Sequence, residues 1–126
     1  MHTVFRYVES ETPPAPYALA TLSGFSGERT NDVPVKLDSG ADRTIVPVDW
    51  VDRLKLDEME RREFEGLSGE RVTLSIVRLR IEIRGCRELV VDAAASQGES
   101  YILLGRDVIN CFRIVLDGPN LRLEID

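Results

Sequence analysis

The sequence contains few of the residues that nucleophilic or metal chemistry needs. Its 126 residues include a single histidine, His2, and two cysteines, Cys86 and Cys111. A zinc site or a nucleophile–histidine pair would have to use His2, which lies at a chain terminus, so neither class is favoured. The two cysteines lack CxxC spacing and form no disulfide framework, and we expect free thiols.

Long apolar runs are also missing. No stretch approaches the roughly 18–20 apolar residues that span a membrane, and residues 1–6 lack the apolar region of a signal peptide. The sequence predicts a soluble, cytoplasmic protein, with removal of a membrane anchor as the open alternative. A net charge of −6 without a basic patch argues against nucleic-acid binding. We expect no cofactor and no metal.

Alternating apolar residues predict a mostly β fold in one domain. Pro13, Pro14 and Pro16 make residues 10–16 a stiff connector. Helical turns are expected within 49–59, and a short helix from Asp107, its N-cap, to Phe112. A polar loop is expected at 93–100. The predicted strands cover residues 3–8, 17–22, 32–37, 72–83, 88–92, 101–104, 113–116 and 121–125.

The alternation changes phase within the longest predicted strand. Its first half places apolar residues at 72, 74 and 76, and its second half at 77, 79, 81 and 83. A shift of one residue moves the apolar side chains to the other face of a sheet. The strand therefore bulges, or changes its surroundings, near Ile76 and Val77, as a long projecting hairpin would.

Two short motifs are uninformative alone and informative together. The run from Leu37 to Ala41 reads Leu-Asp-Ser-Gly-Ala, which by itself is typical of a surface turn. The run from Ile102 to Asp107 reads Ile-Leu-Leu-Gly-Arg-Asp, which by itself is a buried strand entering a helix. A hairpin with two glycines at its tip, Gly66 and Gly69, lies between them.

With these motifs the chain resembles the retropepsin family of single-domain aspartic proteases, from about Tyr17 to Ile125. The resemblance implies a closed, mostly β acid-protease barrel with a flap hairpin at about 63–75 and one short C-terminal helix. Residues 17–126 would form this domain and residues 1–16 an N-terminal extension. It also implies a homodimeric endopeptidase that cuts extended peptides between apolar residues.

The resemblance assigns a role to each motif residue. Two copies of Asp38 would activate a water between them, and the two carboxylates would share one proton because like charges this close cannot both ionise comfortably. Arg106 would form an ion pair with Asp42 and brace the loop. The implied catalytic residues are Asp38, Ser39 and Gly40. The implied substrate-binding residues are Gly40, Ala41, Asp42, Gly66, Leu67, Ser68 and Gly69.

Some residues depart from the family pattern. Ser39 stands where threonine is commoner, and Ser68 makes the flap tip less apolar. Ala41 lacks a hydroxyl that could favour the charged carboxylate, which predicts activity at mildly acidic to near-neutral pH. Two alternatives stay open: a retropepsin-like dimerisation or peptide-binding module with weak or no activity, and a monomer that a partner domain activates.

Overall fold

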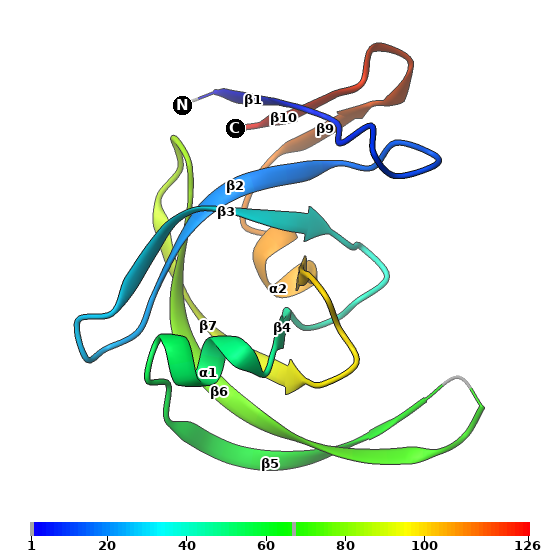
Figure 1. Cartoon of the computed structure of the whole chain (residues 1–126). Helices are drawn as coiled ribbons and strands as arrows, with labels where there is room; N and C mark the ends of the chain where they lie inside the picture. Colours follow the sequence, from blue (N-terminus) through cyan, green and yellow to red (C-terminus); the bar gives the residue numbers. More distant parts are fainter. Residues whose placement is uncertain (1, 67) are drawn as a thin grey trace.

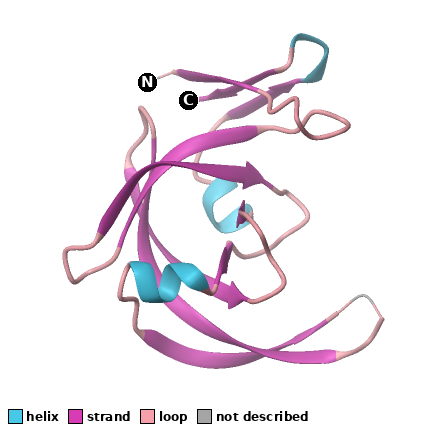
Figure 2. Cartoon of the chain, in the orientation of Figure 1, coloured by secondary structure: helices cyan, strands magenta, loops and turns pink. Residues whose placement is uncertain are grey.

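The computed structural model describes residues 2–66 and 68–126, and strands dominate it (Figures 1 and 2). The helices are short: α1 (Asp49–Arg53), α2 (Arg106–Ile109) and the 3-10 turn η1 (Gly118–Asn120). The strands are β1 (Thr3–Arg6), β2 (Tyr17–Ser23), β3 (Arg29–Leu37), β4 (Ile45–Pro47), β5 (Glu58–Glu65), β6 (Arg71–Ile83), β7 (Glu88–Ser96), β8 (Ile102–Leu104), β9 (Ile114–Asp117) and β10 (Arg122–Ile125).

The main sheet closes into a barrel. Its strands follow the order β2-β3-β8-β4-β7-β6-β5, and an additional pairing of β2 with β6 joins the ends of the first six. Alternate residues of these strands point inward, so Leu22, Val35, Leu79 and Ile102 are almost completely buried in one core. Closure leaves β5 outside the ring, paired only with β6 in the described part of the sheet. The predicted closed β barrel is confirmed.

The β5–β6 hairpin projects beyond the ring, on the side of the barrel away from the chain termini (Figure 1). Its pairing shifts by one residue between Glu58 and Glu60, opposite Ile76 and Val77. The extra residue lies in exposed β5, so β6 can bury both Ile76 and Val77 as it enters the barrel. The predicted irregularity is confirmed, although the chain accommodates it in the partner strand.

The chain ends form a second, three-stranded sheet with the order β1-β10-β9 (Figure 1). Thr3 pairs with Ile125, and Ile125 also pairs with Ile114. The alternation expected for 121–125 is present, because Leu123 and Ile125 are fully buried. β1 and β9 pair with β10 on its two sides, so this strand is not an edge open to a second chain.

Two local predictions are also wrong. Residues 93–96 continue β7 instead of forming a loop, and Ala93, Ala94 and Ala95 are buried in it. The N-cap of α2 is Gly105, while Asp107 lies inside the first turn with its carboxylate bonded elsewhere. No helix in the described ranges is long and apolar enough to cross a membrane.

Candidate active site

Asp38 directly follows β3, at the point where the strand leaves the barrel. Its N–H donates to the Leu104 carbonyl oxygen at 3.0 Å, which continues the β3–β8 ladder by one residue. The Gly40 N–H donates to Asp38 Oδ1 at 3.0 Å, and the Ala41 N–H donates to the Asp38 carbonyl at 3.1 Å. Asp38 is partly exposed, and Ser39 and Gly40 are exposed. The turn therefore holds a carboxylate in a fixed orientation at the surface.

Arg106 braces this turn, by a different contact from the one predicted. Its Nη1 donates to the Ser39 carbonyl oxygen at 2.6 Å, and its main-chain N–H donates to the Ala41 carbonyl at 2.8 Å. The predicted ion pair with Asp42 is not among the ion pairs of the described residues, because the guanidinium is directed to the main chain of the turn. Asp42 is exposed and lines a separate hollow with Arg43.

Beneath the turn lies a polar network that the sequence interpretation missed. Thr44 is fully buried; its hydroxyl donates to Asp107 Oδ1 at 2.8 Å and accepts from the Gly105 N–H at 3.2 Å. The Thr44 N–H donates to both Asp107 oxygens, at 3.1 and 3.0 Å, and the Val108 N–H donates to Oδ1. These bonds fasten the end of the Asp38 loop to the start of α2. The available signal was a threonine directly before the apolar residues Ile45 and Val46.

Gly105 allows the two motifs to touch. A Cβ at this position would lie 2.5 Å from the carbonyl carbon of Arg43 and 2.7 Å from its oxygen. Both contacts are with main chain, which cannot rotate away as a side chain does. The glycine of the second motif therefore lets the end of β8 pass against the main chain at Arg43, just after the Asp38 turn.

The outer face of the barrel around Asp38 carries a row of side chains. Val35 points into the core and is fully buried, so Lys36 and Asp38 lie on the opposite, outer side. Lys36 is the register partner of Leu103 in β8, and Leu103 is the partner of Ile45 in β4. The row thus begins with a cation and continues with two partly buried aliphatic residues. Sequence reasoning missed it, although the alternation of Val35, Lys36 and Leu37 was a signal.

The tip of the β5–β6 hairpin is a tight turn. The Gly66 N–H donates to the Glu70 carbonyl at 2.7 Å, the Gly69 N–H donates to Gly66 at 3.0 Å, and Gly69 has a φ of +84°. The Ser68 hydroxyl donates to the Glu70 carboxylate and lowers its pKa. Leu67 lies outside the described residues. No hydrogen bond between described residues joins the tip to Asp38.

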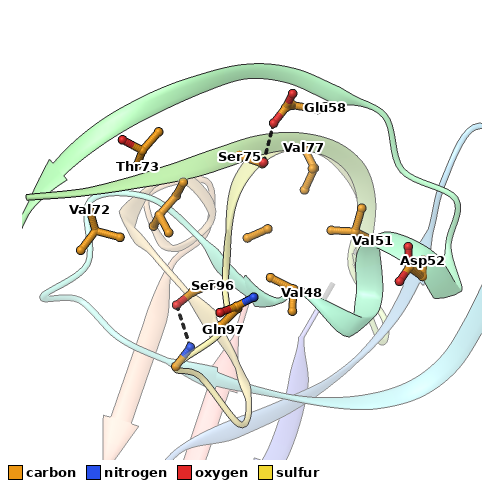
Figure 3. Close-up of a pocket in the computed structure, with 13 residues that line it drawn as sticks. Val48, Val51, Asp52, Glu58, Val72, Thr73, Ser75, Val77, Ser96 and Gln97 are labelled. Carbon is orange, nitrogen blue, oxygen red and sulfur yellow. Dashed lines mark hydrogen bonds between the residues drawn. The ribbon is translucent and has the colours of Figure 1, made fainter.

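A pocket of about 720 Å³ lies between strand β6, helix α1 and the end of β7 (Figure 3). Glu58 faces it, and a 2.5 Å hydrogen bond from the Ser75 hydroxyl lowers the pKa of that carboxyl. None of its lining residues belongs to the Asp38 turn. Its lining residues are Val48, Val51, Asp52, Glu58, Val72, Thr73, Leu74, Ser75, Val77, Ala95, Ser96, Gln97 and Gly98.

Comparisons with known proteins agree with this geometry. A family model described as aspartyl protease matches residues 20–108. A crystal structure of a retropepsin-like aspartic protease from Rickettsia conorii superposes with a TM-score of 0.67 at 13% identity, covering 99% of this chain and 90% of that one. The foamy viral protease-reverse transcriptase in complex with an RNA/DNA hybrid gives a TM-score of 0.55 at 14% identity, over 76% of this chain and 12% of that one. No curated protein sequence matches.

The match covers both the Asp38 turn and the Gly105–Arg106 motif. The chain therefore belongs to the aspartyl protease family. Its fold is that of the retropepsin-like members, a closed β barrel with few helices.

Proposed function

We propose that the chain is one half of a homodimeric aspartic endopeptidase, with Asp38 from each copy at the catalytic centre. The observation that carries this proposal is the Asp38 turn itself. Main-chain bonds to Leu104 and Gly40 and the Arg106 brace hold one carboxylate at the surface, and Ser39 and Gly40 beside it are open to a second copy. One carboxylate cannot serve as acid and base at once, and a symmetric pair can.

In this mechanism a water lies between the two Asp38 carboxylates, which share one proton because two adjacent charges repel. The ionised carboxylate takes a proton from the water, and the water oxygen bonds to the peptide carbonyl carbon. At the same time the protonated carboxyl gives its proton to the carbonyl oxygen, which leaves a tetrahedral diol. The tetrahedral product then collapses. The C–N bond breaks as the nitrogen takes a proton from the protonated carboxyl and one hydroxyl of the diol returns a proton to the ionised carboxylate, so the pair again holds one proton and the products are a carboxyl group and an amine.

The other predicted residues have supporting roles in this proposal. Ser39 contacts its counterpart across the two-fold axis, and Gly40, Ala41 and Asp42 contact the main chain of an extended peptide. The flap tip, including Gly66, Ser68 and Gly69, closes over that peptide and excludes water. The aliphatic row of Leu103 and Ile45 favours apolar side chains near the cleaved bond.

The test is cleavage of a peptide library at about pH 3 to 8 by the wild type, Asp38→Asn and Asp57→Asn. Asp57 is exposed and distant in sequence from the motif, so its variant removes one negative charge as a matched control. Loss of an acid–base group costs about 10²- to 10⁴-fold in rate. We expect this loss in Asp38→Asn only, and inhibition of the wild type by a statine-type compound.

Sedimentation at micromolar concentration accompanies the assay. A dimer that cuts no peptide at any pH would favour the binding-module alternative. A monomer that gains activity only with a second protein would favour the partner-domain alternative. Activity that is equal in Asp38→Asn and Asp57→Asn would refute the catalytic role of Asp38.

A further inference from the structure

The N-terminal segment before β2 contributes to the surface beside Asp38. The Leu37 N–H donates to the Pro16 carbonyl at 3.2 Å, which anchors this segment next to the last residue of β3. Glu11, within the segment, accepts from Lys36 Nζ at 2.8 Å and from the Tyr17 hydroxyl. A residue far from the protease motifs in sequence therefore touches the side chain two positions before Asp38.

Lys36 lies between one carboxylate and two aromatic rings. Its Nζ is 5.8 Å from the centroid of the Tyr17 ring and 5.7 Å from that of Tyr101. The two rings meet edge to face at 5.9 Å. The hydrogen bond from Lys36 and, to a smaller extent, the one from Tyr17 lower the pKa of Glu11, so the carboxylate is ionised at neutral pH. Glu11 thereby compensates the lysine charge, and the rings add cation–π attraction.

Lys36 contacts both Glu11 and Tyr101, and all three side chains are also partly exposed to solvent, where a ligand could reach them. The side chains of Lys36 and Glu11 are 30% and 25% exposed to solvent, and Tyr101 is 47% exposed. Tyr101 precedes β8 and lies two residues before Leu103, so it extends the row of Lys36, Leu103 and Ile45 along the outer face. A peptide lying over Asp38 with its side chain towards β3 and β8 would meet an aromatic face and a neutralised cation.

We propose that Glu11, Lys36 and Tyr101 form the wall that selects the substrate side chain beside the cleaved bond, and that Glu11 makes this wall neutral. The wall then accepts aromatic or aliphatic side chains and gives no advantage to an acidic one. The inference rests on the proposed endopeptidase function. It assigns the N-terminal segment a specificity-determining role, since without Glu11 the ammonium would be an unpaired cation in the substrate groove.

The experiment compares matched peptides that differ only at the residue beside the cleaved bond, which is Leu, Gln, Glu or Lys. The readout is the ratio of kcat/KM for the Glu peptide to that for the Gln peptide, which have nearly the same shape. In Glu11→Gln the free ammonium attracts the Glu side chain across a few ångströms of partly wet groove, which raises this ratio by about tenfold. The control is Glu9→Gln, which removes the same charge from the same segment at an exposed pair with Arg6.

Lys36→Met should shift the preference in the opposite direction, towards the Lys peptide. It also provides a second test if Glu11→Gln does not fold. It leaves the Glu11 carboxylate unpaired by a cation, so the Lys peptide gains about tenfold over the Gln peptide. The double variant Glu11→Gln/Lys36→Met restores the wild-type ratios. If the wild type cleaves the peptides and Glu11→Gln shows the same ratios as Glu9→Gln, the wall is refuted and the protease function stands. If the wild type cleaves none of them, the proposed function itself fails.

Discussion

Replacing Thr44 by valine should destabilise the protein more than the same change in a surface threonine, because Thr44 fastens the Asp38 loop to α2. Valine has nearly the same shape and fits a strand well, so the substitution removes the hydroxyl with little change in packing. The hydroxyl donates to the Asp107 carboxylate at 2.8 Å and accepts from the Gly105 N–H at 3.2 Å, in a site with no exposed surface on Thr44. Valine can make neither bond.

The size of the effect follows from the two losses. A hydrogen bond to a charged group contributes about 1.5–3 kcal/mol, and a buried N–H left without an acceptor costs about 1–3 kcal/mol. The Thr44 N–H still donates to Asp107, which keeps part of the network. Because neighbouring losses do not add fully, we expect a decrease of about 2–4 kcal/mol in the free energy of unfolding. That corresponds to a fall in Tm of roughly 8–16 °C for a domain of this size.

The measurement is denaturant unfolding at one fixed protein concentration, since a dimer's stability depends on concentration. The control is Thr21→Val in β2, where the hydroxyl donates to Asn31 in an exposed pair and the change should stay within about 0.5 kcal/mol. A Thr44→Val protein as stable as Thr21→Val would show that the turn does not depend on this network. Activity measured well below Tm should also fall, because the network positions the loop that carries Asp38.

Two further predictions concern the surroundings of the site. Gly105→Ala places a Cβ 2.5 Å from the Arg43 carbonyl carbon and should unfold or strongly destabilise the protein in a thermal melt. The control Gly98→Ala should not, because its Cβ would meet only a side-chain oxygen at 3.9 Å. Equal melting temperatures for the two variants would contradict the close approach at Gly105. Arg78 donates hydrogen bonds of 2.7 and 3.2 Å to Asp92 and lowers the pKa of that carboxyl. The ionised pair therefore stabilises the fold fully above the ordinary carboxyl pKa, and this contribution disappears as the pH falls through the lowered pKa. Asp92→Asn should therefore lose at most about 1 kcal/mol at pH 7, since the pair is nearly half exposed, and the loss should shrink as the pH falls below the ordinary carboxyl pKa; a difference in denaturant unfolding that stays the same as the pH falls would refute this.

The position of the carboxylate could be predicted from the sequence because each half of the site has a local signature. One strand is followed by Asp38 and Gly40 and another by Gly105, and each of these residues is typical of a turn. The contact of Arg106 could not be predicted, because a guanidinium can reach either the Asp42 carboxylate or a carbonyl. The choice of the Ser39 carbonyl depends on the three-dimensional path of the loop.

The missed features depend on tertiary context. Residues 93–95 are three alanines, which have low β propensity, and they form a strand because β6 and β4 pair with this part of β7 and all three side chains are buried. Asp107 lies two residues after Gly105, where a helix was expected to start, and so resembled an N-cap. Its carboxylate instead accepts from Thr44, a partner 63 positions away that no local pattern reveals.

The terminal sheet changes what the proposed dimer has to supply. Because β10 is paired on both sides within one chain, each subunit completes this sheet without a strand from its partner. The unpaired outer edges are those of β1 and β9 in the described sheet, and the exposed Ser39 and Gly40 lie at the end of β3 on the barrel. A two-fold axis that brings two Asp38 carboxylates together must pass beside that turn. In the proposed dimer the second copy would therefore provide the second acid–base group, while each subunit completes its terminal sheet alone.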